Sequence, residues 1–142
     1  MIRVLVVDDH SFVRASLVAV LDAAVDIEVV GSGADGREVP ELAQATRPHV
    51  VVMDLNMPGV AGVQAAAELG ISHPTIRVLM LTGCTSQQAM AEAARAGAAG
   101  YLYKGGDPTM LVQAVRAVAN GGSAWPGRGS AASRNAQPGI TR

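Results

Sequence analysis

The sequence predicts one α/β domain built on a doubly wound, five-stranded parallel sheet with five helices. Short runs rich in β-branched residues alternate with alanine-rich stretches of helical period, which is the order expected of a parallel α/β sheet. A chain of 142 residues that is 49% hydrophobic is long enough for one domain with its own core. No internal repeat is visible, so a single doubly wound unit is the simplest interpretation.

Five segments have the composition of strands. We expect these strands at residues 2–7, 27–31, 49–53, 76–81 and 99–103. The first, third and fourth are almost continuously apolar instead of alternating. This pattern is typical of parallel strands that helices cover on both faces.

Apolar spacing and end signals place helices between these strands. Residues 11–24 carry apolar side chains at helical spacing. Residues 86–96 begin at the cap residue Ser86 and are followed by a glycine. The last helix should begin near a proline and end at a glycine pair, over residues 108–121. Because Pro40 lies just inside the expected second helix, that helix should start late or be distorted.

The composition changes after residue 122. The stretch SAWPGRGSAASRNAQPGITR is rich in Gly, Ser, Ala, Pro and Arg, and it has no acidic residue and no apolar period. We therefore expect a domain over residues 1–122 and a flexible linker or tail over residues 123–142. Trp125 is the one aromatic residue of this tail, and we expect it to fold back on the end of the last helix.

Composition argues against several function classes. A net charge of −1 creates no field that attracts nucleic acid or an anionic membrane. Aromatic residues make up 3% of the chain, too few for a platform that stacks single-stranded nucleic acid. The apolar runs are strand-sized, so we expect no membrane partner. The single cysteine, Cys84, cannot form an internal disulfide; we expect it to be a small packing residue in a reducing cytoplasm.

Polar side chains follow four of the five predicted strands. Asp8 and Asp9 come after the first strand, Asp54 after the third, Thr82 after the fourth and Lys104 after the fifth. Because parallel strands end at one edge of the sheet, we expect these side chains to converge there. Three carboxylates and a nearby carbonyl make a hard oxygen site that suits Mg²⁺. A divalent ion would also relieve the repulsion between two adjacent aspartates.

The remaining polar groups at this edge extend the same interpretation. Lys104 is the only lysine among eleven basic residues, and its ammonium can hold a phosphoryl oxygen or an aspartate. Thr82 can donate one hydrogen bond to such an oxygen. The arrangement is typical of a phosphoryl-transfer site with a carboxylate nucleophile. His10 follows the acidic pair, but oxygen ligands dominate, so we do not expect a transition-metal site.

Several segments resemble the signatures of a two-component response-regulator receiver domain. In chain order they are VLVVDDHSFVR, VVVMDLNMPGVAG, VLMLTG and AAGYLYKGGDP, and the resemblance covers roughly residues 2–122. The DDH opening, the GYLYK segment and AVRAVANGGSAW are most similar to receivers of the NarL/FixJ type, which carry a C-terminal helix-turn-helix (LuxR-type) output domain. The resemblance implies a flavodoxin-like receiver fold with strand order 2-1-3-4-5.

The resemblance also implies an acceptor and a metal site. Asp54 would be the phosphoacceptor, taking its phosphoryl group from the phosphohistidine of a sensor histidine kinase. Asp8, Asp9 and Asp54 would hold Mg²⁺, together with the backbone carbonyl of Asn56. The family usually has an acidic residue at the position of Ala61, which is not a ligand in the family; its absence bears on the loop more than on the chemistry.

Four further roles follow from the same resemblance. Thr82 and Lys104 would contact the phosphoryl oxygens, and the small residue Gly83 would keep its backbone N–H accessible to them. The ring of Tyr101 would turn inward when Thr82 moves. Phosphorylation would thereby change the surface formed by residues 86–96, the fifth strand and the last helix, where we expect a homodimer to form.

Alternatives remain for the output and for the class of function. The chain ends in GITR, similar to the opening of the family's DNA-binding domain, so we expect a receiver plus linker that is cut where the output domain begins. DNA would then be bound only through a helix-turn-helix domain outside this chain; otherwise the chain is a stand-alone receiver that acts by protein–protein contacts. A Mg²⁺-dependent phosphohydrolase with an aspartyl-phosphate intermediate is the alternative enzyme. Such hydrolases need an aspartate two residues after the nucleophile, where this chain has Asn56, so we expect no enzyme beyond its own phosphorylation and dephosphorylation.

Overall fold

The structure, a computed structural model, describes residues 1–57, 59–83 and 86–125. Within them a single parallel sheet has the strand order β2-β1-β3-β4-β5, as the sequence predicts. The strands are β1 (Ile2–Val7), β2 (Ile27–Gly33), β3 (Val50–Asp54), β4 (Arg77–Thr82) and β5 (Gly100–Tyr103). Each lies within two residues of its predicted position at both ends.

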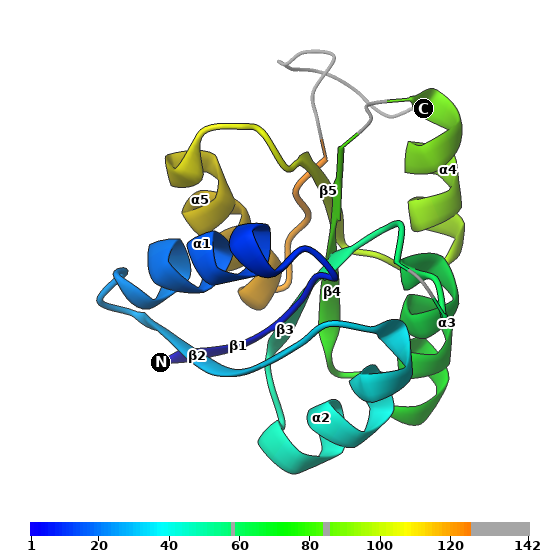
Figure 1. Ribbon diagram of the computed structural model, residues 1–142, viewed down its shortest axis with the longest axis horizontal. Helices are drawn as coiled ribbons and strands as arrows, with labels where there is room; N and C mark the ends of the chain where they lie inside the picture. The colour runs from blue at the N-terminus through cyan, green and yellow to red at the C-terminus, as the bar shows by residue number, and fades with distance from the viewer. Residues whose placement is uncertain (58, 84–85, 126–142) are drawn as a thin grey trace.

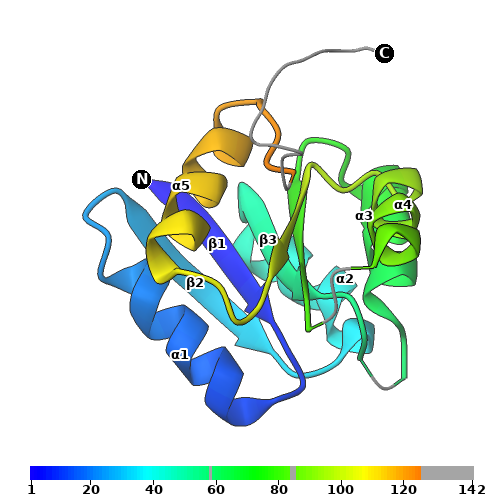
Figure 2. The same cartoon turned by 90° about the horizontal axis from the view of Figure 1, so that it is seen from above.

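Five α-helices alternate with the strands and cover both faces of the sheet. They are α1 (Ser11–Asp22), α2 (Val39–Thr46), α3 (Gly62–Ser72), α4 (Gln87–Arg95) and α5 (Pro108–Ala119), with a short 3₁₀ helix η1 (Gly36–Glu38) before α2. Figure 1 shows α1 and α5 on one face and α2, α3 and α4 on the other, and Figure 2 shows the same two layers from above. No helix within the described ranges is long and apolar enough to cross a membrane.

Each face of the sheet has its own hydrophobic core. Along β1, Val4 and Val6 pack with α1 and α5, whereas Leu5 and Val7 pack with α2, α3 and α4. Successive side chains of a strand point to opposite faces, so a strand covered on both sides needs apolar residues throughout. This requirement explains the continuous apolar runs that predict the central strands.

Local end signals set the helix boundaries as predicted. The hydroxyl of Ser86 caps α4 by accepting a hydrogen bond from the Ala89 N–H at 3.1 Å. Pro40 lies in the first turn of α2, where a missing N–H costs nothing, because the chain first makes the 3₁₀ turn η1. The second helix therefore starts late, and Pro40 does not break it.

The chain after α5 departs from the prediction. Gly121, at φ +89°, ends the helix, and Ala124 then forms a parallel bridge with Gly100 on the free edge of β5. Trp125 stacks on the ring of Tyr101, not on the end of the last helix as expected. Ala124 and Trp125 thus contact β5, and the domain boundary at residue 122 stays a prediction. The rest of the expected tail, 126–142, and Cys84 lie outside the described residues.

Gly62 determines how closely α3 approaches the end of β3. Its N–H donates to the Leu55 carbonyl at 3.1 Å, and a Cβ built on it would lie 2.2 Å from the carbonyl oxygen of Asp54. A side chain here would push the backbone of β3 away, so only glycine allows this contact. Gly70 lies in the same helix, but a Cβ built on it meets nothing within 4 Å.

These two glycines provide a matched test of the packing. We expect Gly62→Ala to lower the free energy of unfolding by about 1–3 kcal/mol, because a buried backbone contact must open. Gly70→Ala should raise it by about 0.5–1 kcal/mol, because alanine has the higher helix propensity. Urea unfolding followed by circular dichroism measures both, and an equal effect of the two substitutions would contradict the role given to Gly62.

Candidate functional site

Three acidic side chains and one lysine meet at the carboxyl edge of the sheet. Asp8 and Asp9 follow β1, Asp54 is the last residue of β3 and Lys104 follows β5. The ammonium of Lys104 lies 2.9 Å from Oδ2 of Asp8 and 3.1 Å from Oδ2 of Asp54. The convergence predicted from the strand ends is therefore present, and a single cation joins two carboxylates from different strands.

Both paired carboxylates are buried. Asp8 is 0% exposed and Asp54 is 3% exposed. Backbone groups help to hold them: the His10 N–H donates to Asp8 Oδ1 at 2.8 Å, and the Asn56 N–H donates to Asp54 Oδ1 at 3.2 Å. Buried ionised groups are stable only when they are paired and hydrogen-bonded, so these contacts fix the position of each oxygen.

Burial and pairing act in opposite directions on the two titrating groups at the centre. Burial is the largest effect on Asp54 and raises its pKa, although the hydrogen bond from Lys104 opposes it. For Lys104 burial alone would lower the pKa, but the hydrogen bonds to Asp8 and Asp54 outweigh it, so its pKa is raised. Lys104 therefore stays an ammonium and favours the ionised form of Asp54.

The oxygens at this edge fit a hard divalent cation. Asp8, Asp9, His10 and Asp54 each offer one ligand atom, and these atoms lie within 4.8 Å of one another. Asp9 Oδ1 is buried and accepts no hydrogen bond from the described residues, and Asp8 Oδ2 has only the neighbouring ammonium of Lys104. A buried oxygen without a donor is what a bound cation would satisfy. The carboxylate set is compatible with Mg²⁺.

Sequence reasoning set His10 aside, yet the structure brings its ring into the cluster. Nδ1 of His10 lies 3.2 Å from Asp9 Oδ1, 3.3 Å from Asp8 Oδ1 and 3.4 Å from the Lys104 ammonium. The side chain is 62% exposed, so it lies at the outer side of the site, where an N–H at Nδ1 would donate to Asp8 Oδ1. Only its place directly after the two aspartates hinted at this position in the sequence.

The other predicted site residues lie around this cluster. Thr82 is the last residue of β4 and is fully buried. Its backbone carbonyl accepts a hydrogen bond from the backbone N–H of Lys104 at 2.8 Å. Gly83 follows it, and a Cβ built there would meet nothing within 4 Å, so its backbone faces open space. Asn56 contributes its N–H to Asp54. Tyr101 is 1% exposed, and the ring of Trp125 stacks on its ring.

Known proteins are similar to this chain in sequence and in fold. The model of the response regulator receiver domain matches residues 4–116. The chain is 43% identical over 118 residues to the response regulator GacA of Pseudomonas protegens, covering 83% of this chain and 55% of that protein. It is 39% identical over 121 residues to the response regulator UvrY of Escherichia coli K12, covering 85% and 56%. The chain thus spans about half the length of the curated relatives it matches.

Solved structures give the same result. The signal receiver domain of NarL from Mycobacterium tuberculosis has a TM-score of 0.80 and 36% identity, covering 84% of this chain and 97% of that one. A two-component response regulator of the LuxR family from Aurantimonas has a TM-score of 0.82 and 35% identity, covering 86% and 87%. With the acidic edge and its lysine in place on this fold, the chain belongs to the response regulator receiver domain family, with relatives among regulators of the NarL/FixJ type.

Proposed function

We propose that this chain is the phosphorylation switch of a two-component system, with Asp54 as the phosphoacceptor. The observation that carries the proposal is the pairing of the Lys104 ammonium with both Asp8 and Asp54, beside the buried Asp9 Oδ1, which accepts no hydrogen bond from the described residues. Membership of the receiver family supports it. The donor is the phosphohistidine of a sensor histidine kinase, and Asp8, Asp9, Asp54 and the backbone carbonyl of Asn56 hold Mg²⁺.

The transfer needs an ionised Asp54. One carboxylate oxygen attacks phosphorus, the bond between phosphorus and the kinase's imidazole nitrogen breaks, and that nitrogen leaves with the electron pair and takes up a proton. Lys104 keeps Asp54 ionised before transfer and holds a phosphoryl oxygen after it. The hydroxyl of Thr82 and the N–H of Gly83 donate to the other phosphoryl oxygens. When bound, Mg²⁺ supplies positive charge beside the phosphoryl group.

The output lies on surfaces and segments next to this edge. Thr82 adjoins the surface formed by α4, β5 and α5, and we propose that this surface forms a homodimer when Asp54 is phosphorylated. Because the relatives are about twice as long, DNA would be contacted through a helix-turn-helix domain that follows a linker within residues 123–142. In this proposal the receiver domain spans residues 1–122, and Ala124, which bridges to Gly100, lies just after it. The cytoplasmic location remains a prediction.

Asn56 favours a switch over a phosphohydrolase. A hydrolase of the aspartyl-phosphate type uses an acid–base aspartate two residues after its nucleophile, and an amide cannot carry that proton. The chain would then catalyse only its own phosphorylation and dephosphorylation.

Phosphoryl transfer to Asp54 is tested by measuring the mass of the intact chain. With Mg²⁺ and acetyl phosphate, we expect the intact chain to gain about 80 Da, one phosphoryl group. Asp54→Ala should gain nothing, because the nucleophile is missing. Asp107→Asn is a matched control: it also removes a carboxylate, but at the α5 cap, where asparagine can still accept the hydrogen bond from Thr109.

Two results would contradict this proposal. An adduct of the same size in Asp54→Ala would place the acceptor elsewhere, and no adduct in the wild-type chain at any Mg²⁺ concentration would remove the switch. Sustained turnover of a phosphomonoester such as p-nitrophenyl phosphate would instead favour the hydrolase.

Magnesium binding is tested without phosphate. A cation that binds only the folded chain, at about a hundred times its Kd, adds about 2.7 kcal/mol to the free energy of unfolding. We therefore expect Mg²⁺ to raise the melting temperature of the wild-type chain, and Asp9→Asn to lose most of that rise because one ligand charge is removed. Asp107→Asn should keep it. Thermal unfolding with and without Mg²⁺ measures this, and equal rises in the wild type and Asp9→Asn would argue against the site.

A further inference from the structure

The three residues Ser123–Trp125, which we call the strap, attach the chain that leaves the domain to the edge of the sheet. The carbonyl of Ala124 accepts a hydrogen bond from the Tyr101 N–H at 2.9 Å, and the N–H of Ala124 donates to the Ala99 carbonyl at 3.1 Å. β5 is the last strand of the sheet, so the strap covers an edge that would otherwise be open. Gly100 permits this approach, because a Cβ there would lie 2.7 Å from the Ala124 carbonyl oxygen.

Trp125 is the strap side chain that stacks on the ring of Tyr101. Trp125 and Tyr101 stack with their centroids 6.3 Å apart and their planes 15° from parallel. Trp125 is half-buried against the core on the α2–α4 face, and it covers Tyr101, which is 1% exposed. The attachment of the outgoing chain therefore depends partly on where the Tyr101 ring lies.

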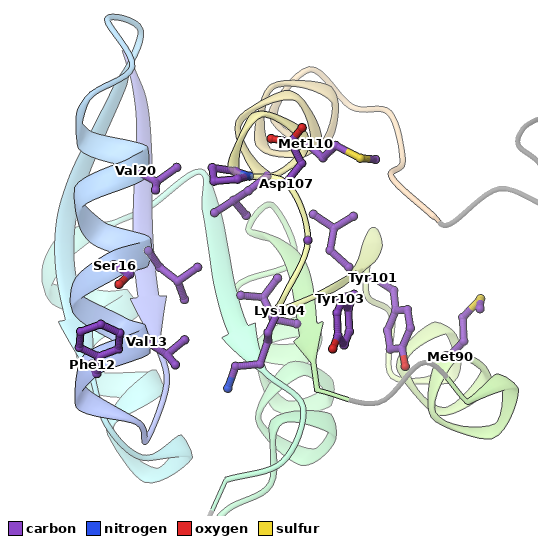
Figure 3. A pocket seen from close by; sticks show the side chains of 16 residues that line it. Phe12, Val13, Ser16, Val20, Met90, Tyr101, Tyr103, Lys104, Asp107 and Met110 are labelled. Carbon is purple, nitrogen blue, oxygen red and sulfur yellow. The ribbon is translucent and has the colours of Figure 1, made fainter.

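Tyr101 also lies on the same face as the proposed phosphoryl contact. Tyr101 pairs in register with Met80, and both belong to the core on the α2–α4 face. Thr82 is two residues further along β4, so its side chain points to that same face. Figure 3 shows Tyr101 between Tyr103 and Met90 of α4, at the end of a pocket of about 510 Å³. The ring thus lines this pocket and is covered by Trp125.

We propose that the strap is a coupling element: displacement of the Tyr101 ring releases Trp125 and weakens the pairing of Ala124 with the edge of β5. This inference rests on the proposed function, because phosphorylation of Asp54 acting through Thr82 is the event that would displace the ring. Coupling is reciprocal, so a docked strap equally holds the ring in its present position. An aromatic pair of this kind shifts such an equilibrium by about 2- to 10-fold.

The contact can be tested without phosphate, because Trp125 is the only tryptophan of the chain and its fluorescence reports the strap alone. Tyr101→Leu keeps apolar bulk but removes the ring. We expect it to increase acrylamide quenching of Trp125 and to speed hydrogen exchange of the Ala124 amide by about 2- to 10-fold. Tyr101→Phe keeps the ring and should behave as the wild type.

A matched control lies on the same strand. Tyr103 is 51% exposed and stands outside the stack, so Tyr103→Leu should leave Trp125 quenching and Ala124 exchange unchanged. If Tyr101→Leu and Tyr103→Leu had the same effect, or Tyr101→Phe matched Tyr101→Leu, the stack would not hold the strap and the inference would be overturned.

Coupling to the acceptor is then measured in the wild-type chain, which needs no substitution to fold. With Mg²⁺ and acetyl phosphate, quenching of Trp125 and exchange of the Ala124 amide should rise as the adduct of about 80 Da forms, and neither should change in Asp54→Ala. An adduct without any change at Trp125 or Ala124 would overturn the coupling while leaving the proposed function intact. Absence of the adduct would instead overturn the proposed function, and the Tyr101 variants would still decide the contact.

Discussion

The rest of the structure depends on one constraint: three carboxylates meet at the carboxyl edge of the sheet, and one lysine lies between two of them. Lys104 contacts Asp8 and Asp54 at 2.9 and 3.1 Å, but Asp9 Oδ1 has no hydrogen-bond donor among the described residues. Like charges this close repel, and burial strengthens the repulsion. One ammonium balances only part of the charge, and the remaining negative charge makes the edge compatible with a bound divalent cation.

The fold holds this unfavourable cluster because its members are anchored to three strands: Asp8 and Asp9 to β1, Asp54 to β3 and Lys104 to β5. β1, β3 and β5 are fixed by helices on both faces, so the carboxylates cannot separate to relieve their repulsion. Close backbone packing adds to this rigidity: Gly62 brings α3 against the end of β3, immediately beside Asp54. Stability gained in two apolar cores thus supports an edge that is electrostatically costly, which is typical of a functional site.

The same edge is connected to the outgoing chain by a short path. Thr82 and Tyr101 lie on one face of adjacent strands, and Trp125 covers Tyr101 while the strap pairs with β5. The carboxyl edge, Tyr101 and residue 125 thus lie along one face of adjacent strands. Tyr101 is already buried here, with Trp125 stacked on it, so the stack and not burial of the ring is what a change at Thr82 would alter.

By itself the sequence determined the sheet, its helices and the convergence of Asp8, Asp54 and Lys104 at one edge. These follow from local signals (apolar period, caps and breakers) and from the rule that parallel strands share one carboxyl edge. Only the tertiary structure decided that His10 turns over the acidic cluster and that Trp125 leaves the helix end for Tyr101. The sequence carries no periodic signal for either, because each depends on contacts through space between segments whose local conformation allows several positions. Gly62 and Gly100 belong to the same class, since a glycine's role in close packing is visible only once the opposing backbone is in place.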